Sequence, residues 1–341
     1  MRIGEREIGV GLVYVIAEIG VNHDGSVGRA CELIDACADA GADAVKFQSF
    51  TARELMSAAC ELAGYQKDAG ESDAMAMLER LQLNAHELAE CVERAHEREI
   101  HAIVTPFTLH DLELMKPLAW DAFKTASPDL INKPLLDAIA GDGRPMIVST
   151  GASTLDEVER AIGWLGHAHD RLAFLQCVSS YPADGPNACL AGIGEIARRS
   201  RSPVGYSDHT PEVHTGAIAV GAGALLLEKH VTHDTGATGP DHGASLDPND
   251  FREYARLARE AAGMMGCGKA VREIENDVRR VSRQSVVSRT AIAKGAALTR
   301  DMLAIKRPGT GIEPWRIESL VGRTASRDIA ADVPIVEDDL S

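Results

Sequence analysis

The chain has 341 residues, of which 45% are hydrophobic and 25% charged, so it can build a sizeable core in one large domain with room for a smaller one. Its formal net charge of −16 argues against nucleic acid or an anionic membrane as a partner, because both would repel it. A small anionic substrate would need a local cluster of cationic groups, backbone N–H groups or a metal ion.

No segment reaches the about 20 apolar residues of a membrane span, and the first residues, MRIGEREIGVG, are charged where a signal peptide would be apolar. We therefore expect a cytoplasmic protein. The cysteines are odd in number, scattered and without a C-x-x-C pair, which argues against structural zinc and a disulfide framework. They are Cys31, Cys37, Cys60, Cys91, Cys177, Cys189 and Cys267.

Short apolar or β-branched segments recur along the chain, and each is followed by a stretch with helical spacing. Strands that are apolar on both faces and alternate with helices indicate a parallel sheet, and eight β-α units close a barrel. We therefore predict an α/β fold with a (β/α)8 TIM barrel over residues 1–268. The expected strands are VYVIAEI (13–19), DAVKFQS (43–49), HAIVTPF (101–107), DAFKTAS (121–127), PMIVSTG (145–151), LAFLQCV (172–178), PVGYSD (203–208) and ALLLEKH (224–230).

Helix start signals lie between these strands. Asn84 precedes one helical stretch, and Thr154 with Glu157 forms a capping-box pattern before another. Further helices are expected over 26–41, 187–200 and 249–266. The stretch 51–83 has no strand pattern, so we expect it to cross over the top of the barrel.

The pattern changes towards the carboxyl end. Residues 284–341 contain short β-like runs interrupted by Gly and Pro, which predicts a separate small β-rich domain. The charged segment 269–283 is expected to be a helical or extended linker between the two domains.

Polar residues gather where the predicted strands end, which is where barrel enzymes place their active sites. Every strand contributes, and this coincidence is harder to dismiss than any single polar residue. The residues are Glu18, Asn22 and His23; Lys46 and Gln48; Thr105; Lys124 and Ser127; Ser149, Thr150 and Gly151; Ser179 and Tyr181; Ser207, Asp208 and His209; Glu228, Lys229 and His230.

Lys46 and Lys124 stand inside otherwise apolar strands, where an unpaired ammonium group would be costly, so each needs an anionic partner. One interpretation is a structural salt bridge. The other is that both lysines meet a phosphate or carboxylate of a ligand, helped by the neighbouring hydroxyl groups.

His209 and His230 end adjacent predicted strands, so their imidazoles could converge on one ion. Two histidines with open positions suit an octahedral divalent ion better than closed tetrahedral zinc. His233 and His242 are alternative ligands that the sequence leaves open. The loop GPDHGASLDP (239–248) adds Asp241, for which turn formation is the simplest role.

Taken together, these motifs resemble the N-acetylneuraminate (sialic acid) synthase family over nearly the whole chain. The tail resembles the antifreeze-like (SAF) domain of these enzymes, most clearly at IKRPGTGI (305–312). Single motifs such as TPF are weak, whereas the ordered set is specific. The motifs are IAEIGVNHDG (16–25), VKFQ (45–48), TPF (105–107), FKTAS (123–127), STG (149–151), SSYP (179–182), GYSDHT (205–210), EKHVT (228–232) and GPDHGASLDP.

The resemblance implies a transferase that condenses phosphoenolpyruvate with an N-acetylmannosamine-type sugar, giving a nine-carbon 2-keto acid (N-acetylneuraminate) and phosphate. Glu18 would be the catalytic carboxylate, and His209 and His230 would bind Mn2+ or Mg2+. Gln48, Tyr181 and Asp241 would contact the sugar, with Arg307 reaching the site of the partner subunit in a domain-swapped homodimer. Phosphoenolpyruvate would be held by Lys46, Thr105, Lys124, Ser127, Ser149, Ser179 and Ser207.

Three positions depart from the family pattern, namely Ser179, Pro128 and Val231. Ser179 stands where some members have Asn, and Pro128 and Val231 replace a glycine and an aromatic residue. None removes a charged or metal-binding group. We expect Pro128 and Val231 to reshape the cavity wall and to affect which acceptor is used.

Three alternatives stay open at this point. The acceptor could be a diacetamido-trideoxy hexose, which gives legionaminate or pseudaminate. The chain could instead be a related barrel synthase that acts on phosphorylated sugars, although such enzymes lack an antifreeze-like tail. It could also be a non-catalytic sugar-binding or coat-assembly protein, against which the intact set of charged residues argues.

Overall fold

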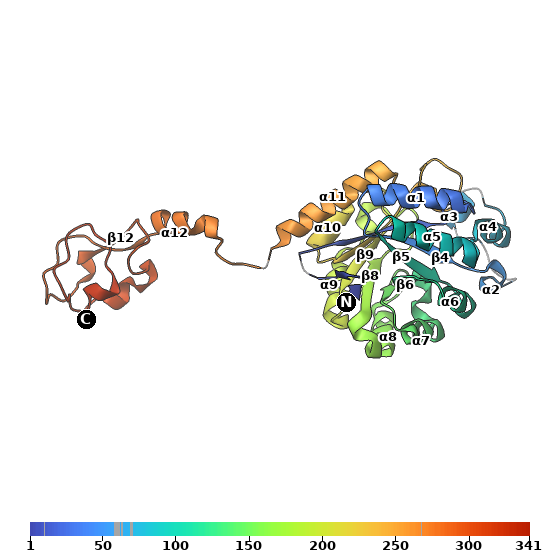
Figure 1. The fold of residues 1–341 in the computed structure, drawn as a ribbon. Helices are drawn as coiled ribbons and strands as arrows, with labels where there is room; N and C mark the ends of the chain where they lie inside the picture. The colour runs from blue at the N-terminus through green and yellow to red at the C-terminus, as the bar shows by residue number, and fades with distance from the viewer. Residues whose placement is uncertain (10, 58–61, 63, 69–70, 267) are drawn as a thin grey trace. The chain divides into compact units, whose positions relative to one another are not determined.

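The computed structural model describes the chain except for residues 10, 58–61, 63, 69–70 and 267 (Figure 1). Contacts between Cα atoms divide it into two compact units, Met1–Gly266 and Cys267–Ser341. No helix in the described ranges is long and apolar enough to cross a membrane. The described cysteines are free thiols, and Cys60 and Cys267 lie outside the description.

The first unit is a closed barrel of parallel strands, as predicted. Neighbouring strands follow the chain order, and the last strand pairs with the first to close the barrel. Each expected strand forms within a residue or two of its predicted limits. The strands are β3 (Tyr14–Gly20), β4 (Ala44–Ser49), β5 (His101–Pro106), β6 (Ala122–Thr125), β7 (Met146–Ser149), β8 (Leu172–Cys177), β9 (Val204–Asp208) and β10 (Leu226–His230).

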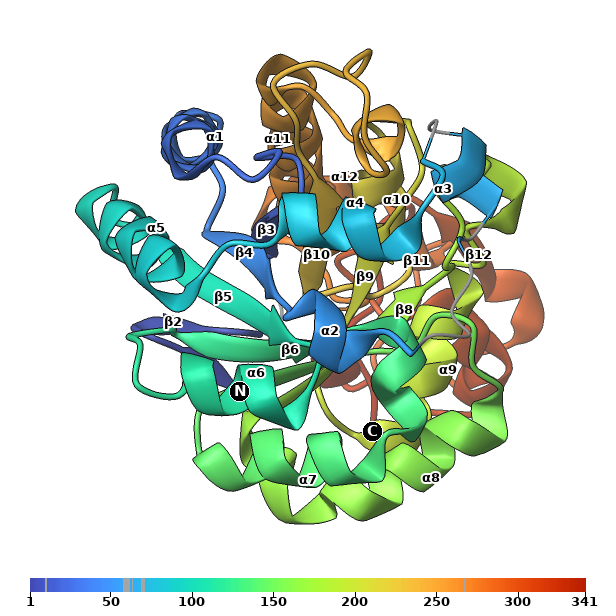
Figure 2. The same cartoon turned by 90° about the vertical axis from the view of Figure 1, so that its right-hand side faces the viewer.

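Helices between the strands cover the outside of the barrel (Figure 2). Capping boxes form at Asn84 and at Thr154, so both predicted helix starts are confirmed. The outer helices are α1 (Val27–Asp39), α5 (Ala85–Glu97), α6 (Leu109–Met115), α7 (Lys133–Asp142), α8 (Leu155–Leu165), α9 (Ala191–Ser200), α10 (Thr215–Gly221) and α11 (Pro248–Met265).

The strands bury side chains on both faces, which explains their continuous apolar character. Ala17 and Val45 belong to the core between the strands and the helices. Ile16 and Ala44 belong to a second core inside the barrel. Successive strand residues therefore alternate between the two cores, with a period of two.

An amino-terminal hairpin was not predicted. It pairs β1 (Arg2–Ile3) with β2 (Arg6–Glu7), and Ile3 and Ile8 pack into the core inside the barrel beside Tyr14. The hairpin fills the amino end of the barrel, so the opposite end is left for the site. Strands of two residues are too short to produce a periodic sequence signal.

The predicted excursion 51–83 contains helices and no strand among its described residues. These are α2 (Ala52–Leu55), α3 (Gly64–Asp68) and α4 (Ala74–Leu81), of which α2 and α4 lie in front of the barrel strands in Figure 2. Met77 and Leu81 of α4 pack against Val21 and Phe50, which follow the first two barrel strands. Part of this range lies outside the description.

The second unit contains a helix, α12 (Asn276–Ser282), within the expected linker. Its sheet pairs β11 (Ser285–Ser288) with β12 (Leu303–Lys306) in antiparallel register. A separate small core contains Val286, Leu303 and Ile335. The small β-rich domain predicted for the tail is therefore confirmed.

Candidate active site

The alternation of strand residues produces a polar layer at the carboxyl end of the barrel interior. Ile16 points into the inner core, and Glu18, two residues later, points to the same side one layer higher. The same step of two leads from Ala122 to Lys124 and from Leu226 to Glu228. Local strand geometry therefore brings charged residues from distant parts of the sequence into one layer.

A cavity of about 350 Å³ opens above this layer. It contains every residue to which the family resemblance assigns a role, except Ser149 and Arg307. The predicted residues that line it are Glu18, Lys46, Gln48, Thr105, Lys124, Ser127, Ser179, Tyr181, Ser207, His209, His230 and Asp241. A second cavity, of about 440 Å³, lies beside the amino-terminal hairpin and contains none of the predicted residues.

The two predicted lysines are buried and paired with carboxylates. Lys46 Nζ lies 2.5 Å from Glu18 Oε2 and donates to Thr105 Oγ1 at 3.1 Å. Lys124 Nζ lies 2.8 Å from Glu228 Oε1. The salt-bridge interpretation is therefore correct. Both ion pairs also line the cavity, so the lysines are in a position to meet a ligand as well.

The two carboxylates experience different surroundings. Burial raises the pKa of Glu18, although Lys46 opposes this. Burial acts in the same direction on Glu228, but the ammonium groups of Lys124 and Lys46 outweigh it and hold the pKa of Glu228 at about 2. A hydrogen bond from Ser207 Oγ, 2.9 Å from Glu228 Oε1, favours the ionised form further. Glu18 is thus the carboxyl that takes up a proton more readily.

A group of hydroxyl groups lies beside Lys124. Ser127 Oγ donates to Ser149 Oγ at 2.9 Å and accepts from the backbone N–H of Gly151 at 3.1 Å. Ser149 is fully buried behind Ser127, so it supports the cavity wall without lining it. A Cβ atom on Gly151 would lie 2.7 Å from Ser127 Oγ, and Ser179 Oγ is closer still. Only glycine fits at this position.

The imidazoles of His209 and His230 lie side by side, with ring centroids 5.6 Å apart. His209 Nδ1 is 2.8 Å from the carbonyl oxygen of Val178, which can only accept, so Nδ1 carries a hydrogen and Nε2 is the nitrogen that can bind an ion when the ring is neutral. Burial and the neighbouring His209 lower the pKa of His230 well below its usual value, so this ring is neutral. Its Nδ1 is buried without a hydrogen-bond partner in the described ranges.

These features fit a divalent ion held by two protein ligands. The described part of the chain contains no cluster of three or more His, Cys, Asp and Glu side chains suited to a metal ion. Water and substrate would therefore have to occupy the remaining coordination positions of the ion, which agrees with the prediction of an ion held by only two histidines. The alternative ligands do not converge there: His233 is exposed, and both ring nitrogens of His242 are hydrogen-bonded elsewhere.

The predicted sugar-contacting residues border the same histidines. The Tyr181 ring lies 4.0 Å from the His209 ring, and Gln48 Nε2 donates to Glu18 Oε1 at 3.0 Å. Asp241 Oδ2 is 3.8 Å from His230 Nδ1, and burial, with the charge of Glu18, raises the pKa of Asp241 to about 6. Arg307 belongs to the second unit, directly after β12.

Of the positions that depart from the family pattern, Pro128 and Ser179 line the cavity. The expectation that Val231 reshapes the cavity wall is wrong. Its side chain is fully buried in the core between the strands and helices, and it does not line the cavity. Its backbone forms an isolated parallel bridge with Leu246.

Sequence reasoning placed Glu228 at a strand end without giving it a role. A signal was present: two lysines in apolar strands require two carboxylates, and Glu18 can satisfy only one of them. Gly20 was also missed. It has a left-handed φ of +55° at a register shift in β3, and a Cβ there would lie 3.0 Å from Glu18 Oε1 and 3.3 Å from Asp241 Oδ2.

Comparisons with known proteins decide the family. A model of the NeuB family matches residues 33–270, and a model of the SAF domain matches residues 283–341. The chain belongs to the NeuB family. The resemblance inferred from the ordered motifs is thereby confirmed, as is the SAF domain in the tail.

Within the NeuB family, the N,N'-diacetyllegionaminic acid synthase of Legionella pneumophila is 36% identical over 331 residues, covering 95% of this chain and 93% of that protein. The human N-acetylneuraminate-9-phosphate synthase is 30% identical over 334 residues, covering 95% and 92%. The N-acetylneuraminic acid (sialic acid) synthetase of Leptospira borgpetersenii is similar in structure, with a TM-score of 0.74, 30% identity and coverage of 82% and 94%.

Proposed function

We propose that this NeuB family member condenses phosphoenolpyruvate with an N-acylated amino sugar to give a nine-carbon 2-keto acid and phosphate. The observation that carries the proposal is the meeting of two buried lysines, several hydroxyl groups and two histidines in one cavity at the carboxyl end of the barrel. This combination offers separate places for a strongly anionic enol ester and for a carbonyl acceptor.

The lysines and hydroxyl groups would hold phosphoenolpyruvate. Lys46 and Lys124 are each neutralised by a carboxylate, so a bound anion would compete with Glu18 and Glu228 for the two ammonium groups. Glu228, with its low pKa, would stay ionised. Glu18 would be the group whose interaction with its lysine changes during the reaction.

In the reaction, C3 of phosphoenolpyruvate forms a bond to the aldehyde carbon of the open-chain sugar, and positive charge develops at C2. Glu18 is the carboxylate that would stabilise this charge and accept a proton from the water that adds to C2. Cleavage of the bond between C2 and the phosphate oxygen then releases phosphate and leaves the 2-keto group. Of the two water protons, the one accepted by Glu18 would pass to the former aldehyde oxygen, which becomes a hydroxyl group, and the other would leave with the phosphate. When bound to His209 and His230, a Mn2+ or Mg2+ ion would supply Lewis-acid polarisation of the aldehyde.

For the acceptor, we favour a diacetamido-trideoxy hexose, with a legionaminate-type product, over the N-acetylmannosamine that the sequence motifs suggested first. Identity is higher to the legionaminic acid synthase, 36%, than to the human neuraminate-9-phosphate synthase, 30%. The cavity supports the same choice, because one side of it is apolar. That side contains Val21, Met77, Leu78, Leu81 and Phe107.

The chemical difference between the two acceptors makes this apolar side informative. In a diacetamido-trideoxy hexose, a second acetamido group replaces one hydroxyl group of N-acetylmannosamine, and a methyl group replaces its hydroxymethyl group. Apolar side chains gain free energy from covering methyl groups and leave hydroxyl groups without partners. A pseudaminate-type acceptor, which differs in stereochemistry, is a third candidate for the same cavity.

The test is an acceptor panel with phosphoenolpyruvate and Mn2+, read by phosphate release and by the mass of the product. We expect turnover with the 2,4-diacetamido-2,4,6-trideoxy sugar of the legionaminate series and a lower kcat/KM with N-acetylmannosamine. A preference for N-acetylmannosamine would overturn the acceptor assignment alone. Turnover only with a phosphorylated sugar, or no phosphate release with any acceptor, would overturn the proposed reaction.

We also propose a domain-swapped homodimer in which Arg307 of one subunit completes the site of the other. Enclosing an aldehyde and a reactive enol phosphate requires the exclusion of bulk water, and a guanidinium group from the SAF domain could contribute to that closure. The expected location of the enzyme is the cytoplasm, where phosphoenolpyruvate is available.

A further inference from the structure

Asp241 occupies an unusual position in the site, because its carboxyl group is held in the cavity by its backbone and neighbours. The residue is 7% exposed, and Oδ2 of its carboxyl group lies 3.8 Å from His230 Nδ1. That distance is too long for a hydrogen bond. The orientation of the carboxyl group must therefore depend on how the loop around residue 241 is fixed.

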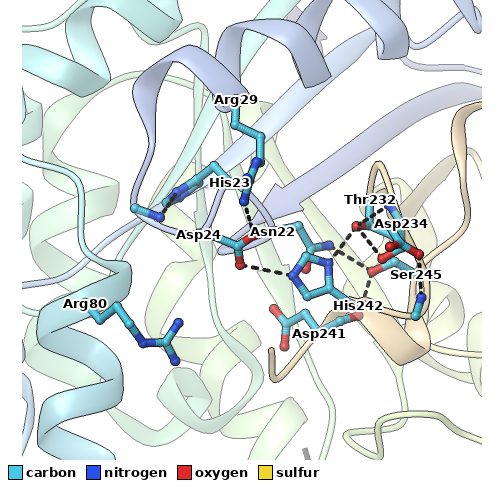
Figure 3. Close-up of polar contacts among 12 residues, drawn as sticks. Asn22, His23, Asp24, Arg29, Arg80, Thr232, Asp234, Asp241, His242 and Ser245 are labelled. Carbon is cyan, nitrogen blue, oxygen red and sulfur yellow. Dashed lines mark hydrogen bonds and ion pairs between the residues drawn. The ribbon is translucent and has the colours of Figure 1, made fainter. Parts of the chain in front are cut away.

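The loop is tied to the segment that follows the first barrel strand (Figure 3). Asn22 Nδ2 donates to the carbonyl oxygen of Val231 and to Ser245 Oγ, both at 2.9 Å. Ser245 Oγ in turn donates to the backbone carbonyl of Asp241 at 2.6 Å. A buried amide from the first strand's loop thus reaches the backbone of Asp241 through one hydroxyl group.

A second tie runs through His242, which is 1% exposed. Its Nε2 lies 3.1 Å from Asp24 Oδ1, and its Nδ1 lies 2.6 Å from Thr232 Oγ1 (Figure 3). A carboxylate can only accept, so Nε2 donates to Asp24. Asp24 is itself paired with Arg29 at the start of α1.

The fit around His242 is close. A Cβ atom on Gly239 would lie 2.7 Å from His242 Cδ2, so the ring needs glycine at that position. Asp24 adopts a left-handed φ of 51°, which is uncommon outside glycine and tolerated best by Asn and Asp. Strained or closely packed backbone on both sides of one hydrogen bond indicates that its geometry is determined by the surrounding structure.

We propose that Asn22, Asp24 and His242 form a clamp that positions Asp241, and that acceptor affinity depends on this clamp although none of the three lines the cavity. This inference rests on the proposed function, in which Asp241 contacts the acceptor sugar. The clamp joins the loops of the first and last strands, the two strands whose pairing closes the barrel. The position of Asp241 is therefore fixed relative to these two strands, which the closed barrel already holds in place.

The experiment is a double-mutant cycle on the full-length protein. Initial rates of phosphate release are measured for wild type, His242→Ala, Asp241→Ala and the double variant, with acceptor varied at saturating phosphoenolpyruvate and the reverse. We expect His242→Ala to raise the acceptor KM about tenfold and to leave the KM for phosphoenolpyruvate within about twofold, since sub-ångström misplacement of a substrate contact has effects of this order.

The decisive comparison is the effect of His242→Ala in the wild-type protein with its effect in the Asp241→Ala variant. If His242 acts through Asp241, its replacement has little further effect once Asp241 is alanine, so the two changes are strongly non-additive. His242→Gln, which keeps a side-chain N–H donor for Asp24, should recover part of the affinity. Asn22→Ala removes the other set of hydrogen bonds to this loop. It should raise the acceptor KM in the same selective way, and it replaces His242→Ala in the test if that variant does not fold.

His110→Ala is the matched control, because His110 is an exposed histidine on α6 and not part of the loop around Asp241. It should leave both KM values unchanged. Additive effects in the cycle, or equal changes in both KM values, would overturn the clamp. An Asp241→Ala variant with an unchanged acceptor KM would do the same. Failure of the proposed function is distinguishable, because the wild-type protein would then release no phosphate with any acceptor.

Discussion

At the scale of single residues, the site depends on two glutamates whose environments differ. Both face a buried ammonium group, yet Glu228 also accepts from Ser207 and has a pKa of about 2, whereas burial raises the pKa of Glu18. Separation of this kind assigns different tasks to chemically identical groups. Glu228 would be a fixed counter-charge for Lys124, and Glu18 would exchange a proton.

Glu18→Gln tests that division. The amide keeps the shape of the side chain and can still accept from Lys46, but it cannot take a proton from water. We expect kcat to fall by about 10²–10⁴, the range for loss of a general base, with a smaller change in the KM for phosphoenolpyruvate. Steady-state phosphate release checks this, with the exposed Glu113→Gln as control. A variant that kept a tenth of the wild-type kcat would exclude Glu18 from proton transfer.

At the scale of elements, the end of α7 shows how one ion pair secures a helix against the barrel. Arg144 pairs with Asp142 at 2.6 Å, donates to the carbonyls of Leu118 and Lys116, and lies over the Phe123 ring. The hydrogen bonds from Arg144 lower the pKa of Asp142 below its ordinary value of 3.8. Since the folded state favours the ionised form, this contribution is present above that value and is lost as pH falls through the lowered pKa.

Asp142→Asn should therefore lower the free energy of unfolding by about 1–2 kcal/mol at neutral pH, the scale of charge-assisted hydrogen bonds. The difference from wild type should shrink once the pH falls below 3.8. Urea unfolding followed by circular dichroism across this range measures both effects. Asp137→Asn is the control, because Asp137 lies on the same helix in an exposed pair with Lys133. A difference that did not depend on pH would show that the charge is not responsible.

Helix α4 carries the apolar side of the cavity, and Leu78 is its half-buried member. Leu78→Asn should lower kcat/KM for the diacetamido-trideoxy acceptor about tenfold and that for N-acetylmannosamine less, because lost contact with methyl groups costs roughly 1–3 kcal/mol. The comparison of both acceptors at saturating phosphoenolpyruvate checks this. The exposed Leu114→Asn on α6 controls for a polar residue in a helix. Equal losses for both acceptors would remove α4 from specificity.

Elements with long apolar runs were predictable from the sequence, and short ones were not. The barrel strands are buried on both faces, so their composition identifies them, and their ends locate Lys46, Lys124 and both histidines. The two-residue strands of the amino-terminal hairpin leave no comparable signal. Glu228 was visible at its strand end, but its pairing with Lys124 depends on strands distant in sequence. Val231 was misjudged because only the register shows that it faces the outer core.

At the scale of the whole molecule, the net charge is −16, whereas the site inside the barrel contains two buried lysines. An acidic surface repels phosphoenolpyruvate, so binding must rely on short-range contacts with the two buried lysines and the hydroxyl groups. Each lysine carries its own glutamate, which keeps the site near neutrality before an anion enters. The guanidinium group proposed to come from Arg307 of the partner subunit would exclude bulk water and so strengthen these short-range contacts.

The domain swap can be tested by mixing two inactive variants. The Glu18→Gln variant has a defective barrel and an intact SAF domain. The Arg307→Ala variant has an intact barrel and a defective SAF domain. If Arg307 acts on the partner's site, mixed dimers contain one site with an intact barrel and an intact arginine, and activity returns to about a quarter of wild type by statistical pairing of two-fold dimers. If it acts within its own subunit, every site in the mixture stays defective. Unfolding and refolding the variants together ensures exchange, and separately refolded samples, pooled afterwards and assayed at once, provide the control.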